Sequence, residues 1–533
     1  MNQSPGHASS LFNSQPEDRN QPLVLALEAA GLEAIAAVGG KNASLGELLR
    51  ELGTEGVRVP GGFATTAYAY GAFLDANRLR QPLGRLLAGL DGNDLAALQA
   101  AGLAARALVL AARLPKDLEQ AILRAYRSLG QASAGGGQAS GVAVAVRSSA
   151  TAEDLPEASF VGEQETFLNV AGEAEVLAAC RRCYASLFTD RAISYRILHG
   201  FDHLEVALSI GVQRMVRSDL GAAGVMFSID TETGFRDAVL LTAAYGLGET
   251  VVQGSVNPDE YLIFKPTLEQ GFAPILSRRL GSKAIRMVYA PGAVASTHPT
   301  GAGPGPEPLA APAPGQTVPS QTVQSQNDPC EQLGLSHTCT LAVDPADRAR
   351  FAITDDEVLQ LARWACRIEA HYSARRGKAT PMDIEWAKDG LTGELFILQA
   401  RPETVESRRS AQVLRSWHLE PHQAPVITRG RAIGASICTG RARIIQDPSA
   451  IASFQQGDLL VTDRTDPDWE PILKLASGVI TNQGGRTCHA AIIAREMGIT
   501  AIVGTGDGTA VIADGEAITA SCCEGDEGLV YRG

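Results

Sequence analysis

Short apolar runs recur along this chain, and longer amphipathic stretches separate them. The clearest helical pattern follows Thr354 and Glu357, which have the spacing of a capping box, and its apolar positions repeat every three or four residues. These positions are Val358, Leu361, Ala362, Ala365 and Ile368. Strand-like runs occur at residues 142–146, 206–212, 238–242 and 395–398. Strands that alternate with helical stretches predict a mixed α/β fold.

Abrupt changes of composition divide the chain into segments. Residues 1–21 are polar and predict a disordered tail, and residues 291–330 hold nine of the chain's 27 prolines. A stretch of that composition buries too little apolar surface to offset its ordering entropy, so we expect a disordered insertion over about 291–340, with structure resuming at Thr354. Residues 406–425 are charged and unpatterned and predict an interdomain linker.

Length and charge narrow the class of protein. A chain of 533 residues is too long for one core and suggests about three or four folding units. The net charge of -13 argues against a nucleic-acid partner or an anionic membrane surface, because both favour a basic face. The N-terminus has no apolar core of a signal peptide, and two arginines interrupt the apolar run 95–114, so no membrane partner is expected.

The cysteines carry no clear chemistry. The chain has nine, and Cys180 and Cys183 form one C-x-x-C with neither a second pair nor a nearby histidine. We interpret this pair as small residues on one helix face and not as a zinc or redox site. A cytoplasmic location is the natural expectation.

A glycine pair ahead of a histidine is the strongest candidate for chemistry. The strand-like run 477–481 leads into Gly484 and Gly485, and the helical pattern that follows ends at Gly498. His489 therefore lies in the first turn of a predicted helix, where unpaired N–H groups and the helix dipole favour anions. The same dipole disfavours imidazolium and keeps the ring neutral and nucleophilic.

The alternative for His489 is a histidine that caps its helix or packs beneath it, which is the commoner role of a lone histidine. Here Arg486 lies three residues earlier, and its guanidinium suits phosphate. Because the arginine, the glycines and the helix start coincide, the pattern favours a phosphate acceptor.

A family resemblance supports this interpretation. The run 484–504, GGRTCHAAIIAREMGITAIVG, closely resembles the phosphohistidine signature of phosphoenolpyruvate synthases and their pyruvate, phosphate dikinase relatives. The run 465–471, TDPDWEP, also resembles the synthases, whereas Thr500 stands where the family usually has proline. The resemblance implies a swivelling β/α phosphohistidine domain over 426–533, with His489 as the phospho-acceptor.

Two basic residues are candidates for phosphate contacts in the first part of the chain. Lys41 follows two glycines at a predicted helix start, but the spacing is not that of a Walker A loop and a surface helix lysine is the commoner role. Arg147 ends an alternating strand and precedes small hydroxyl residues. Its planar guanidinium suits phosphate oxygens, and a structural salt bridge is about equally compatible with the pattern.

Two side chains with hard oxygen donors lie on a predicted pair of strands joined by a turn. Glu385 and Gln399 occur in PMDIEW and LQARPET and could face one pocket. Oxygen ligands of this kind suit Mg²⁺ beside nucleotide phosphates, although alternating acidic strand residues more often face water.

These segments resemble, in the same order, the ATP-grasp half of the family, from about residue 22 onward. The resemblance implies an ATP-grasp domain over 22–405, with Arg147 also catalytic, and with Glu385 and Gln399 binding nucleotide or Mg²⁺. The residues that it implies in contact with ATP are Lys41, Arg147, Gly162, Thr166, Gln213 and Arg401. Thr487 matches a position that is regulated by phosphorylation in family members.

The expected fold class is therefore α/β (α+β), an ATP-grasp domain followed by the phosphohistidine domain. Synthases of this family continue into a C-terminal TIM barrel that binds pyruvate, and no segment here resembles it, so the resemblance covers their N-terminal two thirds. The family reaction of this pyruvate, water dikinase converts ATP, pyruvate and water to phosphoenolpyruvate, AMP and phosphate. We expect this chain to carry the ATP and histidine half, with a homodimer or a separate barrel polypeptide as the partners considered.

Two other functions stay open on the sequence. Rifampicin-type antibiotic phosphotransferases share both parts but carry an acceptor domain between them, and the segment between Glu403 and Val426 is too short for one. A non-catalytic phosphocarrier remnant is the other alternative. The argument against it is the presence of Lys41, Arg147, Glu385 and His489.

Overall fold

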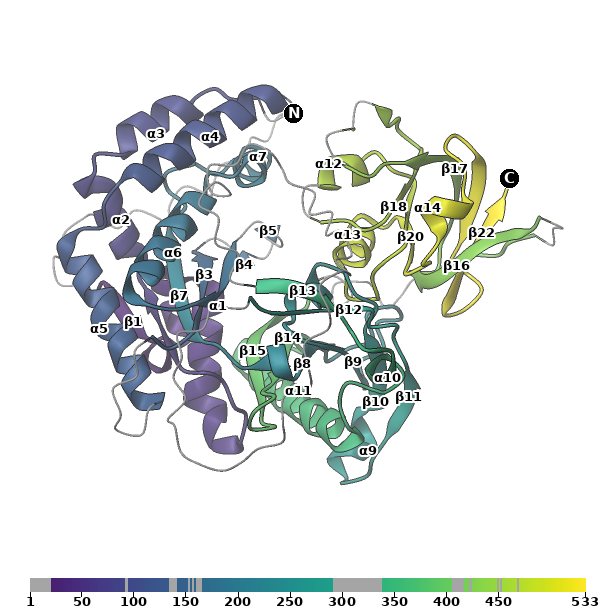
Figure 1. The fold of residues 1–533 in the computed structure, drawn as a ribbon, viewed down its shortest axis with the longest axis horizontal. Coiled ribbons are helices and arrows are strands. Elements are labelled where there is room, and N and C mark those ends of the chain that lie inside the picture. The colour runs from purple at the N-terminus through teal and green to yellow at the C-terminus, as the bar shows by residue number, and fades with distance from the viewer. Residues whose placement is uncertain are drawn as a thin grey trace, which may run out of the picture.

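The computed structural model describes residues 21–91, 94–133, 141–151, 154–155, 158–159, 165–290, 338–404, 417–420, 424–447, 450, 453–466 and 469–533. The predicted insertion up to residue 337, and most of the predicted tail and linker, lie outside these residues. Figure 1 shows three lobes, an N-terminal one in purple and blue, a central one in teal and green, and a C-terminal one in yellow.

The N-terminal lobe is built on an antiparallel sheet with the strand order β1-β2-β7-β3-β6. Its strands are β1 (Val24–Ala26), β2 (Gly62–Thr65), β7 (Leu208–Arg214), β3 (Val144–Ala150) and β6 (Thr166–Val170). The short pair β4 (Asp154–Leu155) and β5 (Ala158–Ser159) follows β3. The lobe's helices are α2 (Ala67–Ala76), α3 (Arg80–Leu87), α4 (Leu95–Ala111), α5 (Lys116–Ser133), α6 (Glu173–Ser186) and α7 (Asp190–His199).

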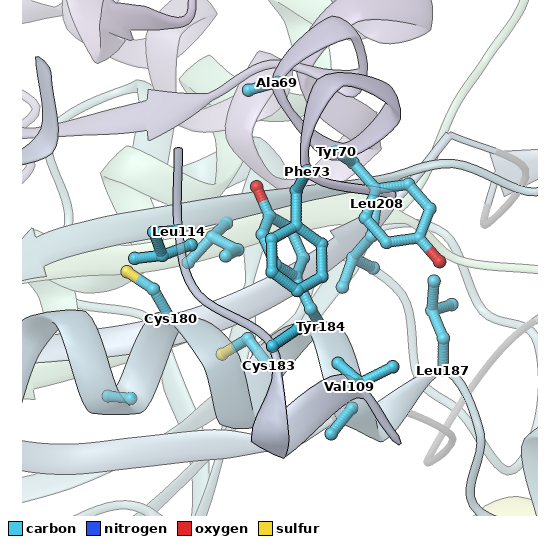
Figure 2. Packing of buried hydrophobic residues seen from close by; sticks show 14 of the residues in the cluster. Ala69, Tyr70, Phe73, Val109, Leu114, Cys180, Cys183, Tyr184, Leu187 and Leu208 are labelled. Carbon is cyan, nitrogen blue, oxygen red and sulfur yellow. The ribbon is translucent and has the colours of Figure 1, made fainter. Parts of the chain in front are cut away.

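Apolar side chains from these helices and from β3 and β7 form one core (Figure 2). Phe73 of α2 stacks on Tyr184 of α6 with 5.0 Å between ring centroids. Cys180 and Cys183 are fully buried in the same core, and burial raises the pKa of the Cys180 thiol to about 12. This burial agrees with their interpretation as packing residues on one helix face.

The central lobe is a second antiparallel sheet with the order β11-β10-β9-β8-β14-β15. Its strands are β11 (Ile275–Arg279), β10 (Asp259–Phe264), β9 (Ala238–Tyr245), β8 (Ala222–Phe227), β14 (Met382–Lys388) and β15 (Leu395–Pro402). Helix α11 (Asp355–Arg376) packs on this sheet together with α1 (Ile35–Glu47), which crosses from the N-terminal lobe. Short helices α8 (Glu249–Val252), α9 (Lys265–Glu269) and α10 (Pro345–Arg348) fill its connections.

The predicted helix after Thr354 is confirmed with its capping box, because the Thr354 side chain and Glu357 bond to each other's backbone N–H. The expectation that structure resumes only at Thr354 is wrong. β13 (Thr338–Ala342) pairs with β12 (Ile285–Tyr289), and α10 follows it. Residues 338–340, placed at the end of the predicted insertion, therefore belong to a strand, because the ladder with β12 satisfies their backbone groups.

The C-terminal lobe is a closed barrel with the order β16-β20-β19-β18-β17-β21-β22. Its strands are β16 (Val426–Ile433), β17 (Ile437–Ile444), β18 (Leu459–Thr462), β19 (Gly478–Thr481), β20 (Thr500–Val503), β21 (Ala517–Ser521) and β22 (Glu527–Arg532). β17, β18, β19 and β20 pair in parallel, and the helices between them are α12 (Glu470–Leu473) and α13 (His489–Met497). The short α14 (Gly508–Val511) follows β20.

Short turns of 3₁₀ helix complete the described structure, at Leu27–Ala29, Leu32–Ala34, Gly53–Glu55 and Ser218–Leu220, and a π-helical turn, Leu48–Leu52, extends α1. Within the described residues no single helix is long and apolar enough to cross a membrane. Only α4 and α5 taken together reach that length and composition, and they are bent by 79°.

Candidate functional site

The antiparallel pair β14 and β15 brings together the side chains that the sequence placed in one pocket. Glu385 and Gln399 are directly opposite each other in the register of the two strands. Arg147, at the middle of β3 in the other sheet, donates through Nη2 to Glu385 Oε2 at 3.1 Å and to Gln399 Oε1 at 2.7 Å. Glu385 and Gln399 therefore lie side by side, and Arg147 joins them from the neighbouring lobe.

Two residues along the same ladder, Asp383 is opposite Arg401. The Arg401 guanidinium donates to Asp383 Oδ2 at 2.8 Å. Burial raises the pKa of Asp383 above its usual value, and the neighbouring Arg401 only partly opposes this effect. The strand pair therefore presents two carboxylates, and each is paired with an arginine: Glu385 with Arg147, and Asp383 with Arg401.

A cavity adjoins this strand pair and is lined by it together with helix α1. Its lining comes from four places in the sequence: α1 with the 3₁₀ turn before it, the residue after β3, the end of α11, and β15. The residues that matter here are Gly40, Lys41, Ser44, Thr151, Tyr372, Arg376, Gln399 and Arg401. The cavity has a volume of about 110 Å³ and opens to solvent.

Lys41 enters the cavity because α1 is kinked at its second turn. Gly39 has φ 74° and ψ 163°, a conformation that favours glycine. A Cβ at Gly39 would lie 2.3 Å from Ser149 Oγ and 2.6 Å from Ser149 O, so only glycine allows α1 to approach β3 this closely. The glycine ahead of Lys41 in the sequence is thus explained by a close approach between α1 and the strand that carries Arg147.

Polar contacts hold α1 against the central lobe. Ser44 Oγ lies 2.6 Å from Tyr372 Oη and donates to Ala400 O at 2.5 Å. One turn later, the fully buried Glu47 accepts from His371 Nε2 at 2.8 Å and Arg375 Nε at 3.0 Å. These bonds fix the lysine-bearing helix relative to β15 and α11, and sequence analysis did not find them, because their partners are over 300 positions apart in the chain.

Replacing Glu47 by glutamine should destabilise the fold by about 3 kcal/mol, because a buried carboxylate that pairs with several cations would be lost. Burial alone raises the pKa of Glu47, but the hydrogen bonds from Arg375 and His371 outweigh it and leave the pKa below its usual value. The ionised form is thus favoured in the fold, and its contribution is lost as the pH falls through that lowered pKa. Urea unfolding measures the effect.

Glu33→Gln is the matched control for Glu47→Gln. Glu33 forms an ion pair with Arg50, but the Glu33 side chain is 59% exposed, so no measurable change in the unfolding midpoint is expected. An unfolding midpoint that does not move in Glu47→Gln would contradict the role given to Glu47.

The remaining predicted nucleotide residues lie apart from the cavity lining. Gln213 on β7 is buried and donates through Nε2 to Pro60 O at 3.3 Å. Thr166 is exposed at the start of β6, opposite Arg147 in the register. Gly162 lies outside the described residues. The structure therefore groups Lys41, Arg147, Glu385, Gln399 and Arg401, and it does not bring Gln213 or Thr166 into that group.

His489 is the first residue of α13, as the sequence predicted, and the helix ends at Gly498 with φ 70°. The helix follows β19, whose carboxyl end lies beside that of the parallel strand β18. Thr465, three residues after β18, places Oγ1 3.3 Å from His489 Nδ1. Thr465 was not singled out as a site residue, although adjacent carboxyl ends of parallel strands are a known signal for ligand sites.

The His489 ring is 8% exposed and electrically neutral at physiological pH. Burial lowers its pKa from 6.5 to about 4, and the positive charge of Arg191 on α7 adds to the effect. The expectation of a neutral imidazole therefore agrees with the geometry, with a different dominant cause. Burial and a nearby guanidinium lower the pKa, whereas the sequence argument relied on the helix dipole.

Arg486 lies in a different environment from the one expected for a phosphate ligand. Its guanidinium donates to Asp526 Oδ1 at 2.8 Å and lies 3.9 Å from both Asp230 and Glu232 of the central lobe. Thr487 is also buried, at 3% exposure. In this arrangement Arg486 pairs with carboxylates and the Thr487 hydroxyl is covered.

The residues grouped around Arg147 and the histidine lie on different lobes. We call this group, Lys41, Arg147, Glu385, Gln399 and Arg401, the nucleotide cluster because these are the nucleotide residues that the sequence predicted. None of the described residues that line the cavity belongs to the barrel lobe. Arg191, in the N-terminal lobe, is nevertheless close enough to His489 to act on its charge state. The first turn of α13 thus faces the lobe that carries Lys41 and Arg147.

Comparisons with known families account for most of the chain. Residues 35–302 and 311–418 match the family described as the pyruvate phosphate dikinase AMP/ATP-binding domain. Residues 454–525 match the mobile domain of the PEP-utilising enzymes. The second match includes His489, and the first includes every residue of the nucleotide cluster.

Several relatives of this chain are named phosphoenolpyruvate synthase. A phosphoenolpyruvate synthase from Synechocystis sp. is 55% identical over 96% of this chain, and those from Aquifex aeolicus and Escherichia coli are 48% and 50% identical over 97% and 96% of it. The matched regions cover 57%, 55% and 58% of these relatives. The chain thus spans rather more than half the length of the relatives it matches.

Proposed function

This chain belongs to the family of the pyruvate phosphate dikinase AMP/ATP-binding domain, and from that premise we propose that it transfers a phosphoryl group from ATP to His489 as part of a phosphoenolpyruvate synthase reaction. The relatives named phosphoenolpyruvate synthase support this reaction. The single observation that carries the proposal is the meeting of Arg147, Glu385 and Gln399 beside the cavity that Lys41 enters.

The proposed domains follow the sequence boundaries. An ATP-grasp domain over 22–405 has its cleft between the two sheets, and a swivelling phosphohistidine domain occupies 426–533. The two antiparallel sheets joined across Arg147 support the first assignment, and the closed barrel with His489 at a helix start supports the second. The proposed linker, 406–425, lies mostly outside the described residues.

In the proposed reaction the cationic side chains Lys41, Arg147 and Arg401 bind the phosphates of ATP and balance the charge that develops during transfer. Gly162, Thr166 and Gln213 are proposed as further ATP contacts on the family resemblance alone. Gln213 needs a change of partner for this role, because its amide now bonds to Pro60.

The proposed Mg²⁺ ligands fit the ion's chemistry. Glu385 Oε2 and Gln399 Oε1 are hard oxygen donors that converge on one guanidinium; Gln399 lines the cavity, and the Glu385 side chain is 30% exposed. Bound Mg²⁺ would neutralise phosphate charge and orient the transferred group. With the ion present, Arg147 is free to turn from these oxygens to the phosphates.

We assign the attacking atom to His489 Nε2. Thr465 Oγ1 contacts Nδ1, so that a proton on Nδ1 leaves the lone pair on Nε2. As the bond from Nε2 to the β-phosphorus forms, the bond from that phosphorus to the oxygen of AMP breaks, and AMP leaves. Water then removes the outer phosphate, and the phosphoryl group on Nε2 passes to pyruvate at a site that the family resemblance places in a further domain.

The direct test is incubation of the purified protein with Mg²⁺ and ATP radiolabelled at the β-phosphate. The proposal requires radioactivity on the protein through an acid-labile, base-stable bond, together with stoichiometric AMP. ATP radiolabelled at the α-phosphate is the control and should leave no label. A folded protein that releases no AMP and acquires no label would refute the proposal.

The pH dependence of labelling offers a further prediction. Because the pKa of His489 is lowered from 6.5 to about 4, the ring stays neutral as the pH falls, and the initial labelling rate should stay level from pH 8 to roughly pH 5. The lowered pKa also means that protonation favours the unfolded chain below pH 6.5, so stability declines toward pH 4. Thermal melts at each pH identify the range in which the protein is folded. A labelling rate that falls with an apparent pKa near 6.5 would contradict the assignment.

A further inference from the structure

Two loops of the central lobe meet the segment that leads to His489. The loop before β10 supplies Asn257 Oδ1, which accepts from Gly484 N at 2.8 Å. A Cβ at Gly254 would lie 2.5 Å from Cys488 Cβ, and one at Gly485 would lie 3.1 Å from Pro258. The backbone of 484–488 is therefore in direct contact with the central lobe.

The second loop, between β8 and β9, supplies charge. Glu232 pairs with Arg495 of α13 through Oε1 and accepts from Gly434 N through Oε2 at 2.8 Å. Arg486 lies 3.9 Å from both Glu232 and Asp230. Beside this group, Arg431 pairs with Glu260 at 3.3 Å.

These ionic side chains are buried between the lobes. The side chains of Arg431, Arg486 and Arg495 are 10%, 8% and 5% exposed, and those of Asp230, Glu232 and Glu260 are 12%, 10% and 11% exposed. Charges removed from water in this way favour one docked orientation, because a mismatched docked orientation would bury a charge without its partner. The interface therefore specifies how the barrel lobe sits on the central lobe.

Glu232 links the interface to the histidine by a short path. Arg495 donates to the carbonyl oxygen of Arg486 at 2.6 Å as well as to Glu232. Arg495 is on the helix that His489 begins, and Arg486 lies three residues before His489. Through Arg495, Glu232 is therefore connected to the helix that follows His489 and to the backbone of Arg486 that precedes it.

We propose that Glu232 is a positioning residue, which docks the phosphohistidine lobe on the central sheet and so holds His489 toward the ATP-binding lobe. The proposal rests on the proposed function, in which the same histidine must also leave for a second acceptor. The docked state serves the transfer from ATP, and the release of Glu232 from Arg495 and from Gly434 N accompanies departure.

The test compares the full-length protein with Glu232→Gln. We expect the rate of labelling from β-radiolabelled ATP at saturating ATP to fall at least tenfold, while the affinity for ATP changes less than twofold, since Glu232 does not line the cavity. Hydrogen–deuterium exchange of the peptides that contain Gly434 and Gly484 should become faster. Glu269→Gln changes an exposed glutamate of the same lobe and is the matched control, with no expected effect on any of the three measurements.

Asn257→Ala is a second variant, which removes the acceptor for Gly484 N without touching a charge. Asn257→Ala should also make exchange faster and labelling slower, and both effects should be smaller than in Glu232→Gln. Wild-type exchange in both peptides, or a wild-type labelling rate, in folded Glu232→Gln would overturn the proposal. If the wild-type protein acquires no label, the proposed function fails, and the exchange data alone then decide whether Glu232 docks the lobe.

Discussion

Replacing His489 by alanine should abolish labelling from β-radiolabelled ATP, with a loss of at least about 1,000-fold in the rate of phosphoenzyme formation. The imidazole is the proposed nucleophile, and the alanine side chain has no lone pair to offer. His489 neither lines the cavity nor belongs to the nucleotide cluster, so ATP binding should persist in the variant. Acid-quenched labelling and equilibrium ATP binding measure the two quantities separately.

His418→Ala is the matched control, because His418 is an exposed histidine in the described part of the chain. It should label at the wild-type rate. His489→Gln tests the role of packing, since glutamine fills similar space without nucleophilic nitrogen, and it should also fail to label. Equal labelling of the wild type and of His489→Ala would place the phosphate elsewhere.

Arg147→Met should lower the labelling rate by about 100-fold, which corresponds to about 2.7 kcal/mol of transition-state stabilisation. Arg147 is the one residue of the cluster that comes from β3, and it bonds to both Glu385 and Gln399 across the gap between the lobes. Methionine keeps the aliphatic length and removes the charge and the guanidinium donors. The loss should be largest in the transfer step, and single-turnover measurements separate that step from ATP binding.

Arg127→Met is the control for this substitution. Arg127 forms a similar pair with Glu173, at 2.6 Å, but its side chain is 56% exposed and lies on the surface of α5. Its replacement should leave the labelling rate unchanged. A loss below about threefold in Arg147→Met would show that the arginine holds the lobes together and takes no part in transfer.

Local pattern was enough to predict the elements that carry the site. The capping box at Thr354 is a contact within one turn, and the glycine at each end of the His489 segment is a matter of local backbone conformation. The two strand-like runs that hold Glu385 and Gln399, joined by a turn, predict the neighbouring strands β14 and β15. Such features depend on neighbours a few residues away, and the sequence contains them directly.

Boundaries were less accurate where pairing over a long range decided them. β13 follows a long polar stretch, and its sequence alone did not reveal a strand. Its ladder with β12 spans the residues 291–337, so that its partner lies about fifty positions back in the chain. The pairing that orders β13 is therefore not visible in any short stretch of the sequence around it.

The sequence by itself determined the position of His489 at a helix start and the two strands, joined by a turn, that carry Glu385 and Gln399. The tertiary structure alone decided that Arg147 closes that pair from another lobe, that Arg486 meets carboxylates, and that burial beside Arg191 sets the charge of the imidazole. The reason is physical. Periodicity and capping are short-range properties of the chain, whereas the partner of a charge and its exclusion from water depend on which distant surfaces come together.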